Sequence, residues 1–105
     1  MSYTRKKGRD FGKFFTDDEY AKVNEVCRRY ADAMDGIAGM NLQYSSIKRF
    51  DAMCTAPAAL SGDVASDLEM ELAHYVPGVV TVGEARISDI GGGMHRVQVP
   101  LFPAR

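Results

Sequence analysis

The hydrophobic pattern of this chain changes its period once, at Pro77-Gly78. Before that point the apolar residues recur at spacings of three and four, which is typical of amphipathic helices. After it they are β-branched or alternate with polar residues, which is typical of strands. Helices followed by strands, rather than the two in alternation, favour an α+β fold. We expect three helices followed by a C-terminal β-hairpin, with a basic N-terminal arm in front.

The first helix has a clear start signal at residues 16–19, where Thr16 is followed three positions later by Glu19. This is a capping box, and Phe15 and Tyr20 hold the positions of a hydrophobic staple across it. One apolar stripe follows, made of Tyr20, Val23, Val26, Cys27, Tyr30 and Met34. Gly36 then stands where a left-handed C-terminal cap is expected. The pattern predicts a helix over 17–35.

Two further helices are expected before the change of period. Helical spacing is kept by Tyr44, Ile47, Phe50 and Cys54, which predicts a second helix over about 41–54. Pro57 then prevents easy continuation. A third helix is expected to begin at Ser61, which is a good N-cap, and to end at Pro77-Gly78. Its buried stripe would consist of Val64, Leu68, Leu72 and Tyr75.

The residues after Gly78 predict two strands joined by a turn. Residues 79–82 are largely β-branched, and the apolar phase shifts at Gly83, which indicates a bulge or bend. The last strand alternates from His95 to Leu101. Because Pro100 cannot donate a ladder hydrogen bond, this strand is expected to lie at an edge or to end there. An isolated hairpin is only marginally stable, so it should pack on the helices or pair with strands of another copy.

The length of 105 residues suits one domain, with an arm over 1–15 and a small α+β domain over 16–105. No apolar run approaches the ~18–20 residues that span a bilayer, and no apolar secretory core follows the basic start, so we expect a cytoplasmic protein. Cys27 and Cys54 both fall in helix-like segments. We interpret them as buried reduced thiols, with a bridge between them as the alternative.

Opposite charges are segregated along the chain. Residues 1–13 carry five basic residues against Asp10, a formal charge of +4, whereas residues 14–105 hold the other eight basic and thirteen acidic residues, a formal −5. The net charge of −1 is therefore a cancellation of two opposite blocks. A charged tail on an oppositely charged body indicates a segment that meets a partner.

We interpret the arm as the candidate partner-binding segment, formed by Arg5, Lys6, Lys7, Arg9, Phe11, Lys13, Phe14 and Phe15. Its cations would steer association, and its aromatic residues would supply buried area. The first expected partner is an acidic protein surface, including that of another copy in a homo-oligomer. The second is nucleic acid, because basic arms bind phosphate backbones through counterion release. A solvated arm without a partner is the third interpretation.

No motif indicates catalysis, a cofactor or a metal. Residues 91–93 are three glycines that could cradle an anion, but a strand-like segment follows them rather than a helix, so we read a hairpin loop. His74, His95, Cys27 and Cys54 are the softest metal ligands of the chain, and they lack the paired spacing of metal sites. We therefore predict no catalytic residue, no cofactor and no metal.

The order of helix, strand, loop and strand that begins at Tyr75 resembles the end of the wedge family of contractile phage-tail baseplates. That family carries Glu-Pro-Arg at the helix-to-strand corner, where this chain reads Val76-Pro77-Gly78. We transfer no site from the resemblance. It implies a viral structural component, which would be assembled in a virion rather than cytoplasmic.

The sequence favours a non-enzymatic protein-binding or assembly component, from a phage or other mobile element, that docks through its α+β body and its basic arm. The alternative is a nucleic-acid-binding protein that uses the same arm. The third hypothesis is a small enzyme, which would need a polar cluster that the spacing does not reveal.

Overall fold

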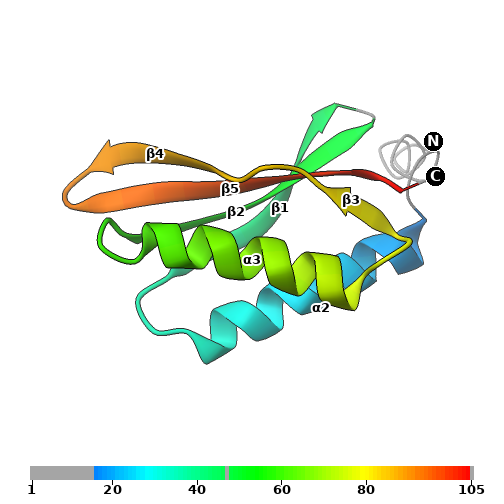
Figure 1. Ribbon diagram of the computed structural model, residues 1–105, viewed down its shortest axis with the longest axis horizontal. Coiled ribbons are helices and arrows are strands. Elements are labelled where there is room, and N and C mark those ends of the chain that lie inside the picture. The colour runs from blue at the N-terminus through cyan, green and yellow to red at the C-terminus, as the bar shows by residue number, and fades with distance from the viewer. Residues whose placement is uncertain (1–15, 47, 105) are drawn as a thin grey trace, which may run out of the picture.

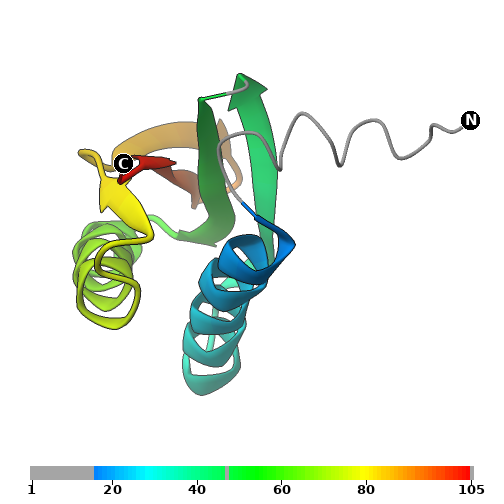
Figure 2. The same cartoon turned by 90° about the vertical axis from the view of Figure 1, so that its right-hand side faces the viewer.

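The computed structural model describes residues 16–46 and 48–104, and in these residues two helices cover one face of a five-stranded antiparallel sheet (Figures 1 and 2). The elements follow the chain in the order α2 (Asp17–Ala33), β1 (Ala38–Ser46), β2 (Arg49–Pro57), α3 (Ser61–Tyr75), β3 (Val80–Val82), β4 (Arg86–Gly91) and β5 (Met94–Pro103). The strands lie in the order β1-β2-β5-β3, with β4 also paired to β5. Neither helix is both long enough and apolar enough to cross a membrane.

The predicted helix over 41–54 is wrong, because this segment forms the β1–β2 hairpin. Tyr44 lies on β1 directly opposite Phe50 of β2, and Ile47 falls outside the described residues. Along β2 the residues Phe50, Ala52, Cys54 and Ala56 are buried at every second position, which is the period of a strand. The fold is α+β as expected, but it consists of two helices and a five-stranded sheet instead of three helices and a hairpin.

The two remaining helices form close to their predicted positions. The capping box of α2 is present: the Glu19 amide donates to Thr16 Oγ1 at 3.0 Å, and the Thr16 amide donates to Glu19 Oε1 at 2.9 Å. In α3 the expected N-cap is displaced by one residue, because Leu60 is the N-cap and Ser61 is the first helical residue. The Ser61 hydroxyl instead donates back to the Ala58 carbonyl at 3.0 Å.

One edge of the sheet is a strand in two pieces. β4 pairs with the first half of β5 and β3 with the last three residues, and residues 83–85 interrupt them. Two hydrogen bonds fix this gap: the Gly83 amide donates to the Pro100 carbonyl at 2.8 Å, and the Ala85 amide donates to Glu69 Oε2 at 2.6 Å. The gap lies at the bend that the phase shift at Gly83 indicated.

The expectation that Pro100 marks an edge or an end is wrong, because β5 lies between β2 and the two-piece edge and continues to Pro103. The amide nitrogen and the carbonyl of one strand residue point to the same neighbour. Since the Pro100 carbonyl accepts from Gly83, the position of its missing N–H also faces the gap, where no ladder bond is lost. The C-terminal hairpin is therefore not isolated, because β5 pairs with β2 along its other side.

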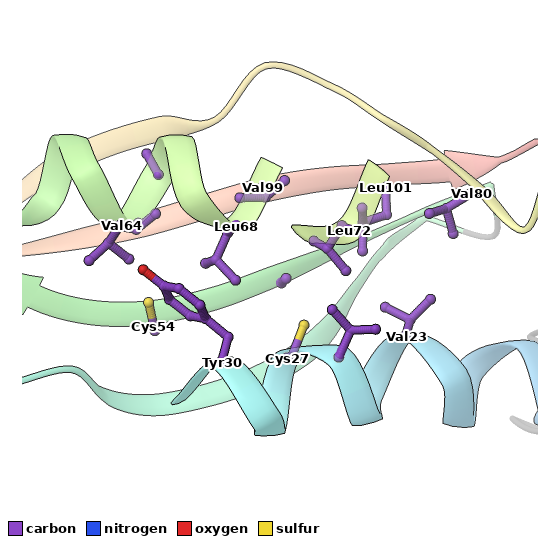
Figure 3. Close-up of a cluster of buried hydrophobic side chains, with 14 of the residues drawn as sticks. Val23, Cys27, Tyr30, Cys54, Val64, Leu68, Leu72, Val80, Val99 and Leu101 are labelled. Atoms are coloured by element: carbon purple, nitrogen blue, oxygen red, sulfur yellow. The ribbon is translucent and has the colours of Figure 1, made fainter. Parts of the chain in front are cut away.

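The hydrophobic core lies between the helices and the sheet (Figure 3). Val23, Cys27 and Tyr30 of α2 and Val64, Leu68 and Leu72 of α3 point toward Cys54, Val99 and Leu101 of the sheet. Complete burial of an aliphatic side chain of this size contributes roughly 1.5–3 kcal/mol. This packing occupies one face of the sheet only, and the face turned away from both helices bears no helix in the described part of the chain (Figure 2).

We predict that Gly83→Ala lowers the free energy of unfolding by about 1–3 kcal/mol, because the new methyl group would overpack the gap. A Cβ at Gly83 would lie 2.9 Å from Pro100 Cγ and 3.1 Å from Phe102 Cε2. The matched control is Gly62→Ala in α3, where a Cβ meets nothing within 4 Å and should stabilise the helix by about 0.5–1 kcal/mol. Urea unfolding measures both changes, and equal stabilities of the two variants would contradict this account.

Candidate interaction surface

The side of the sheet away from the helices is lined by polar and charged side chains, and we call it the open face. Directly opposite residues of antiparallel strands project on the same side, so the register assigns its members. It includes Asn41 and Gln43 of β1, Arg49, Asp51, Met53 and Thr55 of β2, Thr81 of β3, Arg86 and Ser88 of β4, and Arg96, Gln98, Pro100 and Phe102 of β5. All five strands thus contribute to one continuous surface.

At the centre of the open face a carboxylate is completely hydrogen-bonded. Asp51 is only 2% exposed, and it accepts from Arg49 Nε at 2.9 Å, from Ser45 Oγ at 3.0 Å and from Gln98 Nε2 at 2.8 Å. Burial alone would raise the pKa of Asp51, but the hydrogen bonds from Arg49, Gln98 and Ser45 outweigh it and lower the pKa. This carboxylate links β1, β2 and β5, and its oxygens are already used. We therefore assign it a structural role.

Two arginines of the open face have a different environment. Arg86 lies opposite Gln98 and Arg96 lies opposite Ser88, so the two arginines are diagonal neighbours on adjacent strands. Such neighbours are about 7–8 Å apart, within reach of long side chains. Both are exposed, and neither forms an ion pair with any residue in the described ranges. Within those same ranges, the acid on the open face is Asp51, which Arg49 neutralises.

The acids of the body concentrate on the helices. α2 contains five acidic residues and α3 four, against Lys22, Arg28 and Arg29 in α2 and no lysine or arginine in α3. The two layers of the fold therefore differ in charge: the helical layer is acidic, and the open face presents exposed cations among amides and hydroxyls. This separation becomes visible only when the register assigns each strand residue to one face of the sheet.

A serine and a histidine 34 positions apart meet at the beginning of α3. His95 Nδ1 lies 2.8 Å from Ser61 Oγ, which also lies 3.0 Å from the Ala58 carbonyl. Because a carbonyl can only accept, the Ser61 hydroxyl donates its proton to the Ala58 carbonyl. In the hydrogen bond between Ser61 and His95, His95 Nδ1 is then the donor and Ser61 Oγ the acceptor. Asp89, opposite His95 in the register, accepts from the Gly91 amide at 2.9 Å.

Both thiols are free and buried, as the sequence indicated, although Cys54 lies on a strand and not on a helix. Burial, with a smaller effect of Cys54, raises the pKa of Cys27 to about 12, and burial raises the pKa of Cys54 to about 11. Protonated buried thiols are poor nucleophiles. The neighbouring Tyr30 hydroxyl donates to Asp67 Oδ2 at 3.0 Å and ties α2 to α3.

The residues that sequence reasoning selected for binding lie outside the described part of the chain. They are Arg5, Lys6, Lys7, Arg9, Phe11, Lys13, Phe14 and Phe15. The three glycines at 91–93 have positive φ and form the β4–β5 turn, which confirms the hairpin loop. In the residues that the structure describes, no three His, Cys, Asp or Glu side chains are placed to hold a metal ion.

No protein-family model, curated protein or solved structure matches this chain. The resemblance to the baseplate wedge family therefore stays a sequence-based expectation.

We predict that acid destabilises the protein partly through Asp51. The pKa of Asp51 is lower in the folded protein than its ordinary value of 3.8. The stability that the ionised Asp51 contributes to the fold is therefore complete above that ordinary value and is lost as the pH falls through the lower pKa of the folded state. Asp51→Asn should lower the free energy of unfolding at pH 7 by about 1–3 kcal/mol and should flatten its decline below pH ~5. Asp32→Asn, an exposed change on α2, should stay within about 0.5 kcal/mol of the wild type at pH 7. Urea unfolding at several pH values measures these effects, and an unchanged acid profile in Asp51→Asn would contradict the assignment.

We also predict that native Cys27 and Cys54 resist thiol reagents. At pH 8 the reaction with an aromatic disulfide should be on the order of a hundredfold slower in the native protein than in urea, because the raised pKa values and burial both remove accessible thiolate. The absorbance of the released thiol measures both rates. Thiols that react as fast in the native protein as in urea would contradict the burial of Cys27 and Cys54 in the core.

Proposed function

We propose that the protein is a non-enzymatic binding protein that docks an acidic protein partner on the open face of its sheet. The observation that carries the proposal is the placement of Arg86 and Arg96 as exposed diagonal neighbours without an acid of the described chain to pair them. The acidic helical layer on the opposite side repels the same partner and so orients it.

The chemistry of the open face suits carboxylates. Two adjacent guanidinium groups repel each other until an anion lies between them, and each can bind a carboxylate through two parallel hydrogen bonds. The surrounding amides and hydroxyls, among them Gln43, Thr55 and Ser88, supply further hydrogen bonds of the kind found at the polar rim of interfaces. The arm, residues 1–15, adds cationic charge of the same sign and enters the proposal through its composition alone.

Three polar arrangements support a role without catalysis. The oxygens of Asp51 are used by neighbouring side chains, the proton of Ser61 is donated to a carbonyl, and the thiols are held protonated. Nucleophilic catalysis needs a nucleophile whose base accepts its proton. The Ser61–His95 pair has the opposite donor order, so it anchors α3 to β5.

A nucleic-acid partner is the second candidate, and one observation favours it. Phe102 lies on the open face at 37% exposure, with the Arg49 guanidinium carbon 6.0 Å from its ring centroid. An exposed aromatic ring and arginines on an open sheet are the groups that stack and hold single-stranded nucleic acid. A single such ring is a small platform, and for this reason we place the protein partner first.

The test uses the full chain and two labelled probes, a poly-glutamate peptide and a single-stranded RNA, measured by fluorescence anisotropy at low salt. We expect the peptide to bind, and the double substitution Arg86→Ser with Arg96→Ser to weaken it about tenfold, equivalent to about 1.4 kcal/mol. Arg28→Ser on α2 removes one positive charge from the acidic layer and should leave the affinity unchanged. Deletion of residues 1–13 should leave folding intact and weaken binding.

The outcomes separate the two candidates. Tighter binding of the RNA, lost in Phe102→Ala, would replace the protein partner with nucleic acid. Binding of neither probe at low salt, or equal loss in Arg28→Ser and in the double variant, would refute an anionic partner on the open face.

A further inference from the structure

The second edge of the sheet is strand β1, which carries none of the charges or prolines that commonly protect an edge. Natural edge strands carry charges or proline, are short, or are covered, because their backbone groups otherwise pair with another chain. β1 is nine residues long and contains no charged residue and no proline. Among the described strands it pairs with β2 alone. A long uncharged edge of this kind is a template for strand addition.

The opposite edge of the same sheet is protected. It is broken at residues 83–85, and its longer piece, β4, carries Arg86 and Asp89. The two edges of the sheet therefore differ in how they are protected. One edge has a break and charges of both signs, and the other has neither.

We propose that β1 pairs with β1 of a second copy of this chain, in antiparallel orientation across a two-fold axis. The two five-stranded sheets would then form one continuous sheet with the helices of both copies on the same face. The β1–β2 register is regular from Asn41 to Tyr44 and shifts on either side of this run. These two irregularities confine the new pairing to the central residues of the strand.

The composition of β1 points to a copy of itself as the occupant. In an antiparallel pair about a two-fold axis, the residue at the axis lies opposite its own copy. The residue before it lies opposite the residue that follows the axis in the other copy. A charged residue there would meet an identical charge, which is destabilising. All nine residues of β1 avoid this conflict. On the open face the amide of Gln43 can both donate to and accept from its copy, and on the helical side the half-buried Leu42 extends the apolar layer.

The pairing uses the backbone of an edge and not the arginines of the open face, so it stands or falls independently of the proposed function. It also does not depend on the arm. The expected species is a reversible dimer, since a short strand addition without a large hydrophobic interface is modest in area.

Analytical ultracentrifugation of the full chain over a wide concentration range tests the proposal. We expect a monomer–dimer equilibrium, and we expect Gln43→Lys to raise the dimer dissociation constant about tenfold or more, because the two new charges would lie close together across the axis. Ser88→Lys is the matched control: it adds the same charge to the same face at the other edge. It should leave the dissociation constant unchanged. Circular dichroism verifies that both variants are folded.

A wild-type chain that stays monomeric at all concentrations would overturn the proposal. So would a dimer that Gln43→Lys leaves intact, or one that both lysine substitutions weaken equally. Slower hydrogen exchange of the backbone amides at 41–44 with rising protein concentration would support it.

Discussion

Strand β5 hydrogen-bonds β2 along one side and both β3 and β4 along the other, and the sheet exists only because these pairings coexist. Its alternation sends Val97, Val99 and Leu101 under the helices and Gln98 and Phe102 to the open face. One strand therefore carries both the core and the candidate surface. The constraint is strict, because a register slip of one residue would exchange these two sets of side chains.

The polar residues of the sheet divide into two kinds by whether their charge is satisfied. Asp51 is buried and receives hydrogen bonds from three side chains, so its charge is satisfied within the fold. Arg86 and Arg96 are exposed, of like sign and close together, an arrangement that contributes nothing to folding. Within residues 16–46 and 48–104 neither arginine forms an ion pair, and this is the observation on which the proposed interaction surface rests.

The sequence revealed the features that are encoded locally. The capping box and the stripe of α2 lie within one stretch of chain, and their signals need no long-range partner. The β1–β2 hairpin was misread because Tyr44, Phe50 and Cys54 also satisfy helical spacing. The alternation that identifies β2 runs through Ala52 and Ala56, whose small side chains add little to a hydrophobic pattern. The candidate surface was beyond sequence reasoning for another reason: Arg86 and Arg96 become neighbours only through a register, as do Ser61 and His95.

The gap between β3 and β4 also divides the sheet mechanically. β4 is exposed at all six of its residues, and its ladder to β5 ends before the gap, where the Gly83 and Ala85 amides are held separately. Detaching β4 would remove no buried residue from the core and would leave β5 paired to β2, whereas detaching β3 would uncover Val80 of the core. We therefore expect the two pieces to open with different free energies, and β4 to open before β3.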